Sequence, residues 1–365
     1  MAKLVHTADL HIRRDEKDYC YAVLAEIIAL TRQQKAEFLA ISGDLFDSFS
    51  EFEALRREVA DMLAPLAKEG CHVIYIPGNH EARGATSDLS AFNLEPLRYC
   101  ARGPFDFFEL GGVEFLCVPH SESYGGYRDW KVPTKQHGVV RVALLHALNS
   151  AIYIGPDEEA DSRTGVIEDD FFGRFAVDYA AMGHVHSGRQ HTLGGAVACY
   201  PGSPRVWRAH PREAGPRCAV VADLGCSPVV AHPAELLSAG QYREFSLPLG
   251  FDGAPPLTAV HRMEAALREQ DYARVTLTGV VEDENAAKAA ADGLRQRLCS
   301  RVRAAEVQLE TLVASSLSSN TLARAFLEAI DDLKPADEIG DQYRRWLLAR
   351  QYGLEAIAER AGKAA

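Results

Sequence analysis

The sequence predicts an α/β protein with two sheets, followed by a small α/β module and C-terminal helices. Three observations support this fold class. Strands and helices alternate over the first 80 residues, short strands dominate after Asp106, and a linker-like stretch follows near residue 250. The chain has 365 residues, which suits two or three domains. Its hydrophobic fraction of 47% and charged fraction of 25% are typical of a globular protein.

The first part of the chain predicts a parallel sheet flanked by helices. Residues 19–34 carry apolar side chains at helical spacing, as at Val23, Leu24 and Ile27. Strand, helix, strand, helix, strand is the order typical of a parallel α/β sheet. The expected elements are strands at 3–7, 38–42 and 71–76 and helices at 19–34 and 51–68.

The second part predicts another sheet, packed against the first. Gly111 and Gly112 separate two apolar runs, which indicates a hairpin. The expected strands of this sheet are 106–110, 113–118, 139–145, 177–182, 196–200 and 218–224.

A domain boundary is expected between residues 236 and 257, because residues 250–256 are rich in glycine and proline. A small α/β module and two helices follow. The expected elements are helices at 258–269, 284–300, 320–333 and 337–360 and strands at 273–278 and 306–312. The predicted domains are therefore residues 1–240, 257–315 and 316–365.

Composition excludes several classes of protein. No apolar run approaches the roughly 20 residues that span a bilayer, and the start lacks the apolar stretch of a signal peptide, so we expect a cytoplasmic protein with no membrane partner. The eight cysteines form no CxxC pair, which argues for reduced thiols and against a structural zinc site.

The net charge of −12 argues against a nucleic-acid partner, because a polyanion prefers a basic surface. Acidic residues at a metal site would weaken this argument, because bound cations would neutralise part of their negative charge. Arginines also gather locally, and each group is either a basic contact surface or an ordinary solvated face. The two groups are Arg205, Arg208 and Arg212, and Arg295, Arg297, Arg301 and Arg303.

Five short motifs each lie at the carboxyl end of an expected strand, where ligands bind in α/β sheets. Their two carboxylates, one amide and four imidazoles could fill two metal sites that share Asp44. This donor mix suits Mn²⁺, Fe or Zn²⁺. Each motif alone is a weak signal, but all five in order are not explained by chance. The motifs are Asp9-Leu10-His11, Gly43-Asp44-Leu45-Phe46-Asp47, Gly78-Asn79-His80-Glu81, His146 and Gly183-His184-Val185-His186.

Glycine precedes a proposed ligand in three motifs, at Gly43, Gly78 and Gly183. We expect these glycines to let the backbone turn sharply off each strand end.

The ordered set of motifs resembles the calcineurin-like metallophosphoesterase superfamily over about residues 1–230. The resemblance implies a two-sheet metallophosphoesterase sandwich flanked by helices, followed by a small α/β cap and C-terminal helices. Within the superfamily the chain is similar to the SbcD-type DNA double-strand-break repair exonucleases. The segments that carry this similarity are residues 6–11, 43–47, 144–146 and 200–204.

The resemblance implies two divalent metal ions, with Mn²⁺ the expected metal. It also implies two catalytic residues. His80 matches a histidine beside the scissile phosphate, and Asp47 matches a carboxylate that orients this histidine. By the same resemblance, one ion is held by Asp9, His11, Asp44 and His186, and the other by Asp44, Asn79, His146 and His184.

The expected function is a metal-dependent DNA exo/endonuclease that hydrolyses phosphodiester bonds in DNA repair. The resemblance also implies partners. The cap would help select DNA, and the helices after residue 320 would bind the coiled coil of an SbcC-type ABC ATPase or simply pack on the cap. Residues 86–100 are expected to form a helix through which two copies make a homodimer.

Three alternatives stay open at this stage. The chain could be a phosphodiesterase of the same superfamily that acts on a small phosphodiester, although such an enzyme would not need the C-terminal residues. It could be a DNA-end-binding subunit that tethers without cutting. It could be a scaffold that has lost catalysis, against which the filled ligand positions speak.

Overall fold

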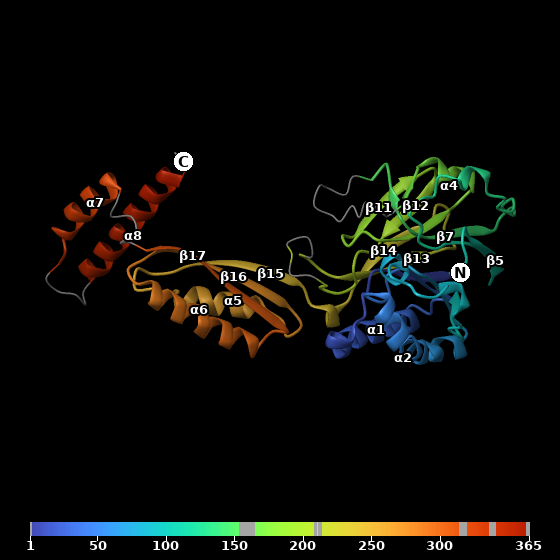
Figure 1. Ribbon diagram of the computed structural model, residues 1–365, viewed down its shortest axis with the longest axis horizontal. Helices are drawn as coiled ribbons and strands as arrows, with labels where there is room; N and C mark the ends of the chain where they lie inside the picture. The colour runs from blue at the N-terminus through green and yellow to red at the C-terminus, as the bar shows by residue number, and fades with distance from the viewer. Residues whose placement is uncertain are drawn as a thin grey trace. The chain divides into compact units, whose positions relative to one another are not determined.

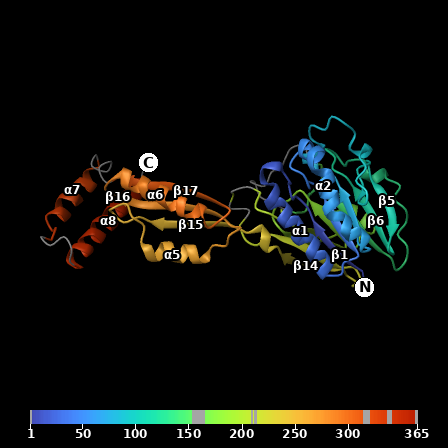
Figure 2. The ribbon, with the colours of Figure 1, turned by 90° about the horizontal axis from the view of Figure 1, so that it is seen from below.

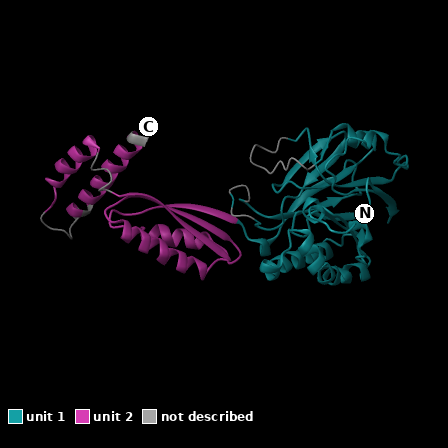
Figure 3. Ribbon diagram, viewed as in Figure 1, with its two compact units in different colours: residues 1–241 teal, residues 242–365 magenta. Residues whose placement is uncertain are grey.

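The computed structural model describes residues 2–152, 165–207, 210, 214–313, 320–335 and 341–362. The chain divides into two compact units, Met1–Gln241 and Tyr242–Ala365 (Figure 3). The predicted fold class is confirmed, because the structure is mixed α/β with two large sheets and flanking helices.

The first sheet carries two long helices on one face (Figures 1 and 2). Side chains at Val5, Leu39 and Val73 point to that face and pack against α1 (Lys17–Gln33) and α2 (Phe49–Lys68). The strand order is β14-β13-β1-β2-β3-β4. β1 to β4 are parallel, β13 pairs antiparallel with β1, and β14 pairs antiparallel with β13. The bounds are β1 (Lys3–Thr7), β2 (Phe38–Ser42), β3 (His72–Ile76), β4 (Arg98–Tyr99), β13 (Cys218–Asp223) and β14 (Val230–Glu235).

The sequences of the two helices explain which face α1 buries and where α2 begins. α1 buries residues three and four apart, among them Val23, Leu24 and Ile27, which is the apolar stripe of a helix on a sheet. α2 begins at Phe49, two residues before the predicted start, because the Ser48 side chain accepts a hydrogen bond from the backbone N–H of Glu51 and caps the helix.

The second sheet packs on the other face of the first. Alternate residues of both sheets, such as Phe38, Ile74, Phe115 and Leu144, form the apolar layer between them. The strand order is β11-β12-β10-β7-β6-β5, with the four central strands parallel and both edge strands antiparallel. The bounds are β5 (Asp106–Leu110), β6 (Val113–Val118), β7 (Val140–His146), β10 (Tyr179–Gly183), β11 (Arg189–Leu193) and β12 (Ala196–Tyr200).

One expected strand changes sheets. Residues 218–224 were expected in the second sheet, but β13 pairs antiparallel with β1 in the first. The apolar run predicts a buried strand correctly, yet its pairing depends on contacts with residues more than 200 positions earlier, which local periodicity does not encode.

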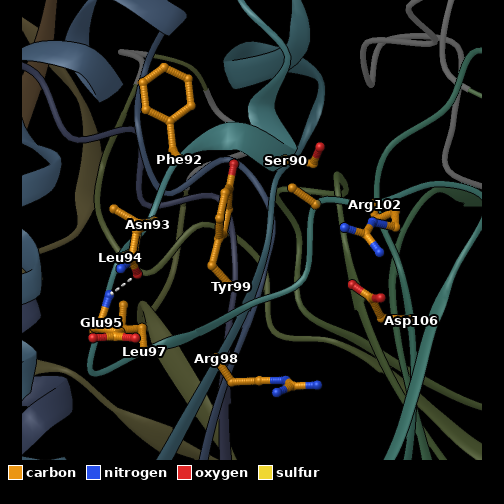
Figure 4. Close-up of a pocket in the computed structure, with 11 residues that line it drawn as sticks. Ser90, Phe92, Asn93, Leu94, Glu95, Leu97, Arg98, Tyr99, Arg102 and Asp106 are labelled. Atoms are coloured by element: carbon orange, nitrogen blue, oxygen red, sulfur yellow. Dashed lines mark hydrogen bonds between the residues drawn. The ribbon is translucent and has the colours of Figure 1, made fainter.

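The expected helix over residues 86–100 is wrong. All of these residues are described, and they form a 3-10 turn at Leu89–Ala91 and the short strand β4, which extends the first sheet beside Ile74 and Tyr75. Pro96 has no N–H to donate and its ring disfavours helix for the preceding residue. The segment lines a pocket, in which Figure 4 shows Phe92 and Tyr99 together with charged side chains. The lining residues are Ser90, Phe92, Asn93, Leu94, Glu95, Leu97, Arg98, Tyr99, Ala101, Arg102 and Asp106.

Smaller elements connect the strands of the first unit. They include short helices, 3-10 turns and a two-stranded parallel ladder. Their bounds are η1 (Arg14–Glu16), α3 (Asn79–Ala82), η3 (Tyr127–Asp129), β8 (Leu148–Asn149), β9 (Val166–Ile167), α4 (Asp170–Arg174) and η5 (Leu237–Ala239).

The second unit begins with a strand that was not expected and that lies within the predicted boundary region, before the linker-like residues 250–256. β15 (Tyr242–Pro248) pairs in parallel with β16 (Tyr272–Val281), which pairs in parallel with β17 (Ala304–Val313). Buried and exposed residues alternate along β15, so its apolar content is too low to stand out in the sequence. The connecting helices α5 (Leu257–Ala266) and α6 (Glu284–Cys299) share one apolar cluster with the sheet.

Two C-terminal helices complete the second unit, α7 (Thr321–Asp331) and α8 (Asp341–Gly362). They pack on each other and on the end of the sheet through a small apolar cluster that contains Phe251, Ala323 and Leu354. The predicted start of the last helix, at residues 337–340, lies outside the described residues.

Several arginines of the two groups are buried or paired with carboxylates. Arg205 is fully buried in the first unit, while Arg208 and Arg212 lie outside the described residues. In the second group, Arg297 donates to the buried Glu264 at 2.8 Å, and Arg301 lies 3.6 Å from the same carboxylate. Within the described residues, no helix is long and apolar enough to cross a membrane.

Candidate metal centre

All five motifs meet at one rim of the first unit, where the parallel strands of both sheets end. Asp9 and His11 follow β1, and Asp44 follows β2. Asn79 and His80 open α3 directly after β3, His146 ends β7, and His184 and His186 follow β10. The structure thus brings together every predicted ligand.

The predicted ligands fall into two clusters. In the first, ligand atoms of Asp9, His11 and His186 all lie within 4.8 Å of one another. The Nε2 atoms of His11 and His186 are 3.1 Å apart. Asp9 and His11 are fully buried, and burial of such polar groups costs free energy unless they are hydrogen-bonded, paired or bound to a metal ion.

In the second cluster, ligand atoms of Asp44, His146 and His184 all lie within 4.8 Å of one another. Asn79 Oδ1 joins them, 2.8 Å from His146 Nε2 and 3.1 Å from His184 Nδ1. These two clusters contain the residues of the two ligand sets that the sequence resemblance implies, except that Asp44, expected in both sets, groups with the second cluster alone.

The hydrogen bonds of His146 show that the second cluster fits a cation. Its Nδ1 lies 2.8 Å from the carbonyl oxygen of Ser42, which can only accept, so Nδ1 carries the hydrogen. In neutral His146 the lone pair of Nε2 then faces Asn79 Oδ1 at 2.8 Å and Asp44 Oδ2 at 3.3 Å. Three acceptors that converge without a donor are the arrangement a bound metal ion satisfies.

Proton affinities in this region indicate the same need for positive charge. Burial raises the pKa of Asp9 to about 8, and the neighbouring Asp44 carboxylate adds to the rise. Burial alone would lower the pKa of His146, but the charge and hydrogen bond of Asp44 raise it to about 9. Without a metal ion, Asp9 and His146 therefore hold protons, whereas burial lowers the pKa of His11 to about 4 and keeps its imidazole neutral.

The backbone is strained at four of the ligand residues. Asp9, His11 and Asp44 have φ of 56°, 48° and 48°, and His184 has φ of 97°. Such values are rare for residues other than glycine and cluster at functional sites. Hydrogen bonds from Asp9 N–H to Gly43 O and from His11 N–H to Asp44 O, both 3.0 Å, hold the two loops in this conformation.

The three motif glycines are required mainly because there is no room for a side chain. A Cβ on Gly43 would lie 2.1 Å from His146 Nδ1, and one on Gly78 would lie 2.2 Å from Asp44 Oδ1. At Gly183 the nearest atom, Ser42 O, would be 1.9 Å away. Of the three, Gly43 alone has a positive φ, of 88°, so the conformational freedom of glycine is needed there, whereas at Gly78 and Gly183 the lack of a side chain is what the site requires.

His80 lies beside the clusters, but Asp47 holds it differently from the expectation. Atoms of His80, Asp47 and His11 form a third group within 4.8 Å of one another. The Nδ1 of His80 donates to the backbone carbonyl of Asp47 at 2.9 Å. The carboxylate of Asp47 instead accepts from Trp207 Nε1 at 2.8 Å and lies 3.5 Å from His11 Nδ1. His80 is also fixed through its backbone N–H, which donates to Asp44 Oδ1 at 2.8 Å.

Two further residues support the site and had not been assigned roles. Glu81 is fully buried, and its carboxylate accepts from the N–H groups of Asp44, Phe46 and Gly78 and from the hydroxyl of Tyr75. Its place in the Gly-Asn-His-Glu motif was the available signal. Trp207 stacks on His11, and no local pattern marks it, because it approaches from a distant loop.

The calcineurin-like phosphoesterase family model matches residues 2–188, just over half of the chain. Solved structures similar to the chain include TT1561 of Thermus thermophilus, with 13% identity, a TM-score of 0.37 and coverage of 64% of this chain and 99% of that one. A dimetal phosphatase from Danio rerio has 12% identity, a TM-score of 0.42 and coverage of 64% and 96%. Yfce, a phosphoesterase from E. coli, has 16% identity, a TM-score of 0.33 and coverage of 66% and 96%. No curated protein matches the chain at a significant level.

The family match covers the strands that carry all seven predicted ligands, and the structure gathers those ligands into two clusters with the donor types of divalent-metal sites. The chain therefore belongs to the calcineurin-like phosphoesterase family and is a metal-dependent hydrolase of phosphoesters.

Proposed function

We propose that the protein is a DNA nuclease of the SbcD type, which hydrolyses phosphodiester bonds in DNA repair with two Mn²⁺ ions. The observation that carries the proposal is the complete donor set, with no ligand position lost, at one rim of the unit. The choice of DNA as substrate is supported by the similarity of residues 6–11, 43–47, 144–146 and 200–204 to that family. A second unit beyond the family match also supports it, because small-molecule phosphodiesterases would not need one.

The ligand residues and His80 divide the chemistry between them. Two divalent ions held by the clusters would supply Lewis-acid charge against the negative phosphodiester. His80 carries its hydrogen on Nδ1, which donates to Asp47 O, so Nε2 is free to exchange a proton with the substrate. The hydrogen bond from the His80 backbone N–H to the Asp44 carboxylate keeps this imidazole beside the proposed metal ligands.

The C-terminal helices support an interaction with an SbcC-type ABC ATPase. α7 and α8 pack on each other through a small apolar cluster but leave other apolar side chains exposed. Leu322, Leu348 and Tyr352 are exposed by 56%, 49% and 63%. Apolar side chains presented along a helical pair fit the apolar stripe of a coiled coil.

The assay uses the purified full-length chain with Mn²⁺. Substrates are single-stranded, double-stranded and hairpin DNA oligonucleotides, beside the generic substrate bis(p-nitrophenyl) phosphate, with Asp44→Ala as control. Cleavage of DNA that is lost in the control supports the nuclease. Cleavage of the generic substrate alone would shift the function to a small phosphodiester. Tight binding of DNA ends without any cleavage would indicate a tethering subunit.

Homodimerisation remains a proposal, although the helix expected to mediate it does not form. Sedimentation of the full-length chain at micromolar concentration tests it directly. A monomer alone under those conditions would contradict it.

A further inference from the structure

The indole of Trp207 covers His11 and binds the carboxylate beside it. The two rings are stacked, with 4.0 Å between centroids and 7° between planes. Trp207 Nε1–H donates to Asp47 Oδ1 at 2.8 Å, and the same oxygen lies 3.5 Å from His11 Nδ1. One side chain therefore restrains the tilt of the imidazole and the position of its carboxylate neighbour.

This arrangement orients His11 for a metal ion. A carboxylate beside Nδ1 favours the tautomer with hydrogen on that nitrogen, which leaves the lone pair on Nε2. His11 Nε2 is the atom that lies 3.1 Å from His186 Nε2, inside the first cluster. Trp207 thus acts on the metal-binding atom through Asp47 and through the ring plane.

The backbone that carries Trp207 is fixed to the loop that carries His11. Arg205 is fully buried, and its guanidinium donates to the carbonyl oxygens of Leu10 and His11 at 2.6 and 2.7 Å. The N–H of Val206 donates to the Tyr19 hydroxyl at 2.9 Å. Arg205 therefore fixes the backbone of His11, and Trp207 fixes the orientation of its side chain.

The same indole contacts two more imidazoles of the site edge to face. Ring centroids are 4.8 Å apart for His186 and 5.5 Å apart for His80, with interplanar angles of 71° and 81°. The contact with His186 reaches the second imidazole of the first cluster. Trp207 therefore contacts both histidines that would hold the first ion.

We infer that Trp207 is a positioning residue for the metal ion held by Asp9, His11 and His186. It acts through His11 and Asp47 and selectively supports one of the two ion sites. The inference rests on the metal centre of the proposed function but not on DNA as the substrate. The competing explanation is that Trp207 is an apolar cover whose loss would affect the whole unit equally.

Mn²⁺ binding to the full-length chain tests the inference without any substrate. Wild type, Trp207→Phe and Trp207→Leu are titrated with Mn²⁺, with free Mn²⁺ followed by electron paramagnetic resonance. We expect two sites in wild type, and in Trp207→Leu a loss of roughly 10–100-fold in the affinity of one site with the other unchanged. Trp207→Phe keeps a ring over His11 but loses the donor, so its loss is smaller.

Trp130→Phe is the matched control, because Trp130 lies in the same unit within an aromatic group with Phe105, Phe171 and Phe175, away from the ligands. Its Mn²⁺ affinities should equal those of wild type. Combined with Trp346→Phe, it leaves Trp207 as the single tryptophan of the three in the chain. Mn²⁺ should then quench its fluorescence with the midpoint of the site that Trp207→Leu weakens.

The outcomes separate the two ideas. Two unchanged sites in Trp207→Leu overturn the role of Trp207 and leave the metal centre intact. An equal loss at both sites, with a lower melting temperature of the metal-free variant, also overturns it, because a general structural role then suffices. A wild-type chain that binds no Mn²⁺ overturns the metal centre and the inference with it.

Discussion

At the scale of single residues, the site is built from side chains whose neighbours fix one hydrogen position each. His80 is the clearest case, because the carbonyl of Asp47 assigns the hydrogen to Nδ1 and leaves Nε2 for the substrate. Glu81 is the converse case, a carboxylate whose acceptors are all used by donors of the chain.

His80→Gln should keep the metal ions and lose most of the turnover. His80 is absent from both clusters that hold the predicted ligands, whereas loss of a proton-transfer group costs about 10²- to 10⁴-fold in rate. Turnover of bis(p-nitrophenyl) phosphate and Mn²⁺ binding by calorimetry are the two measurements. Normal turnover would refute the catalytic role of His80, whether or not Mn²⁺ binding is retained.

Glu81→Gln should destabilise the first unit by about 1–3 kcal/mol, because the new amide NH₂ faces backbone N–H donors in a fully buried place. Urea denaturation measures the change. Glu53→Gln is the control, since Glu53 is an exposed carboxylate on α2 and its change should be close to neutral. Equal stability of the two variants would contradict the supporting role of Glu81.

The sequence indicated which predicted ligands gather at the rim, but not the atoms that orient them. Asp9, His11, Asp44 and His146 were predictable because each stands at the end of a buried strand, and strand ends follow from apolar runs. The use of the Asp47 backbone carbonyl and the stacking of Trp207 were not. The first depends on how the loops after β2 and β3 meet, and the second on how the loop at residue 207 approaches the loop after β1, and no short-range pattern carries that information.

At the scale of elements, the errors have a common cause. β15 was missed because one face of the strand is exposed, and a helix was expected over residues 86–100 although Pro96 lies within them. Both segments lie at sheet edges, where apolar content falls and tertiary pairing decides the conformation.

Replacement of two helical glycines by alanine should change the free energy of unfolding in opposite directions. A Cβ on Gly353 in α8 would lie 2.0 Å from Phe326 Cζ in α7, so Gly353→Ala should push the helices apart and cost about 1–3 kcal/mol. Gly293 in α6 has nothing within 4 Å, so Gly293→Ala should stabilise by about 0.5–1 kcal/mol. Thermal unfolding of both variants measures the difference, and a stabilising Gly353→Ala would show that α7 and α8 are not in contact.

At the scale of the whole molecule, the two units differ in their dependence on metal. Among the described residues, every cluster of metal-ligating side chains lies in the first unit, and the second unit contains none. Metal should therefore stabilise one unit and leave the other unchanged.

Removal of metal with a chelator should lower the melting temperature of the first unit alone. Mn²⁺ at about 100 times its dissociation constant adds about 2.7 kcal/mol per site, because it binds the folded state only. Calorimetry with and without chelator should show one transition that moves and one that does not. A shift of both transitions, or of neither, would contradict the assignment.

The position of β1 has a consequence for how the protein is made. β1 is synthesised before the other strands of its sheet, yet it lies inside that sheet, between β2 and β13, and Lys3 pairs with Asp223. At about 5–20 residues per second, one flank of β1 stays open for roughly 10–40 s of synthesis. His184 and His186 are also made late, so neither ion site has its full ligand set until about half of the chain exists. A nascent chain therefore lacks a complete metal centre until then, and its open strand needs protection from aggregation.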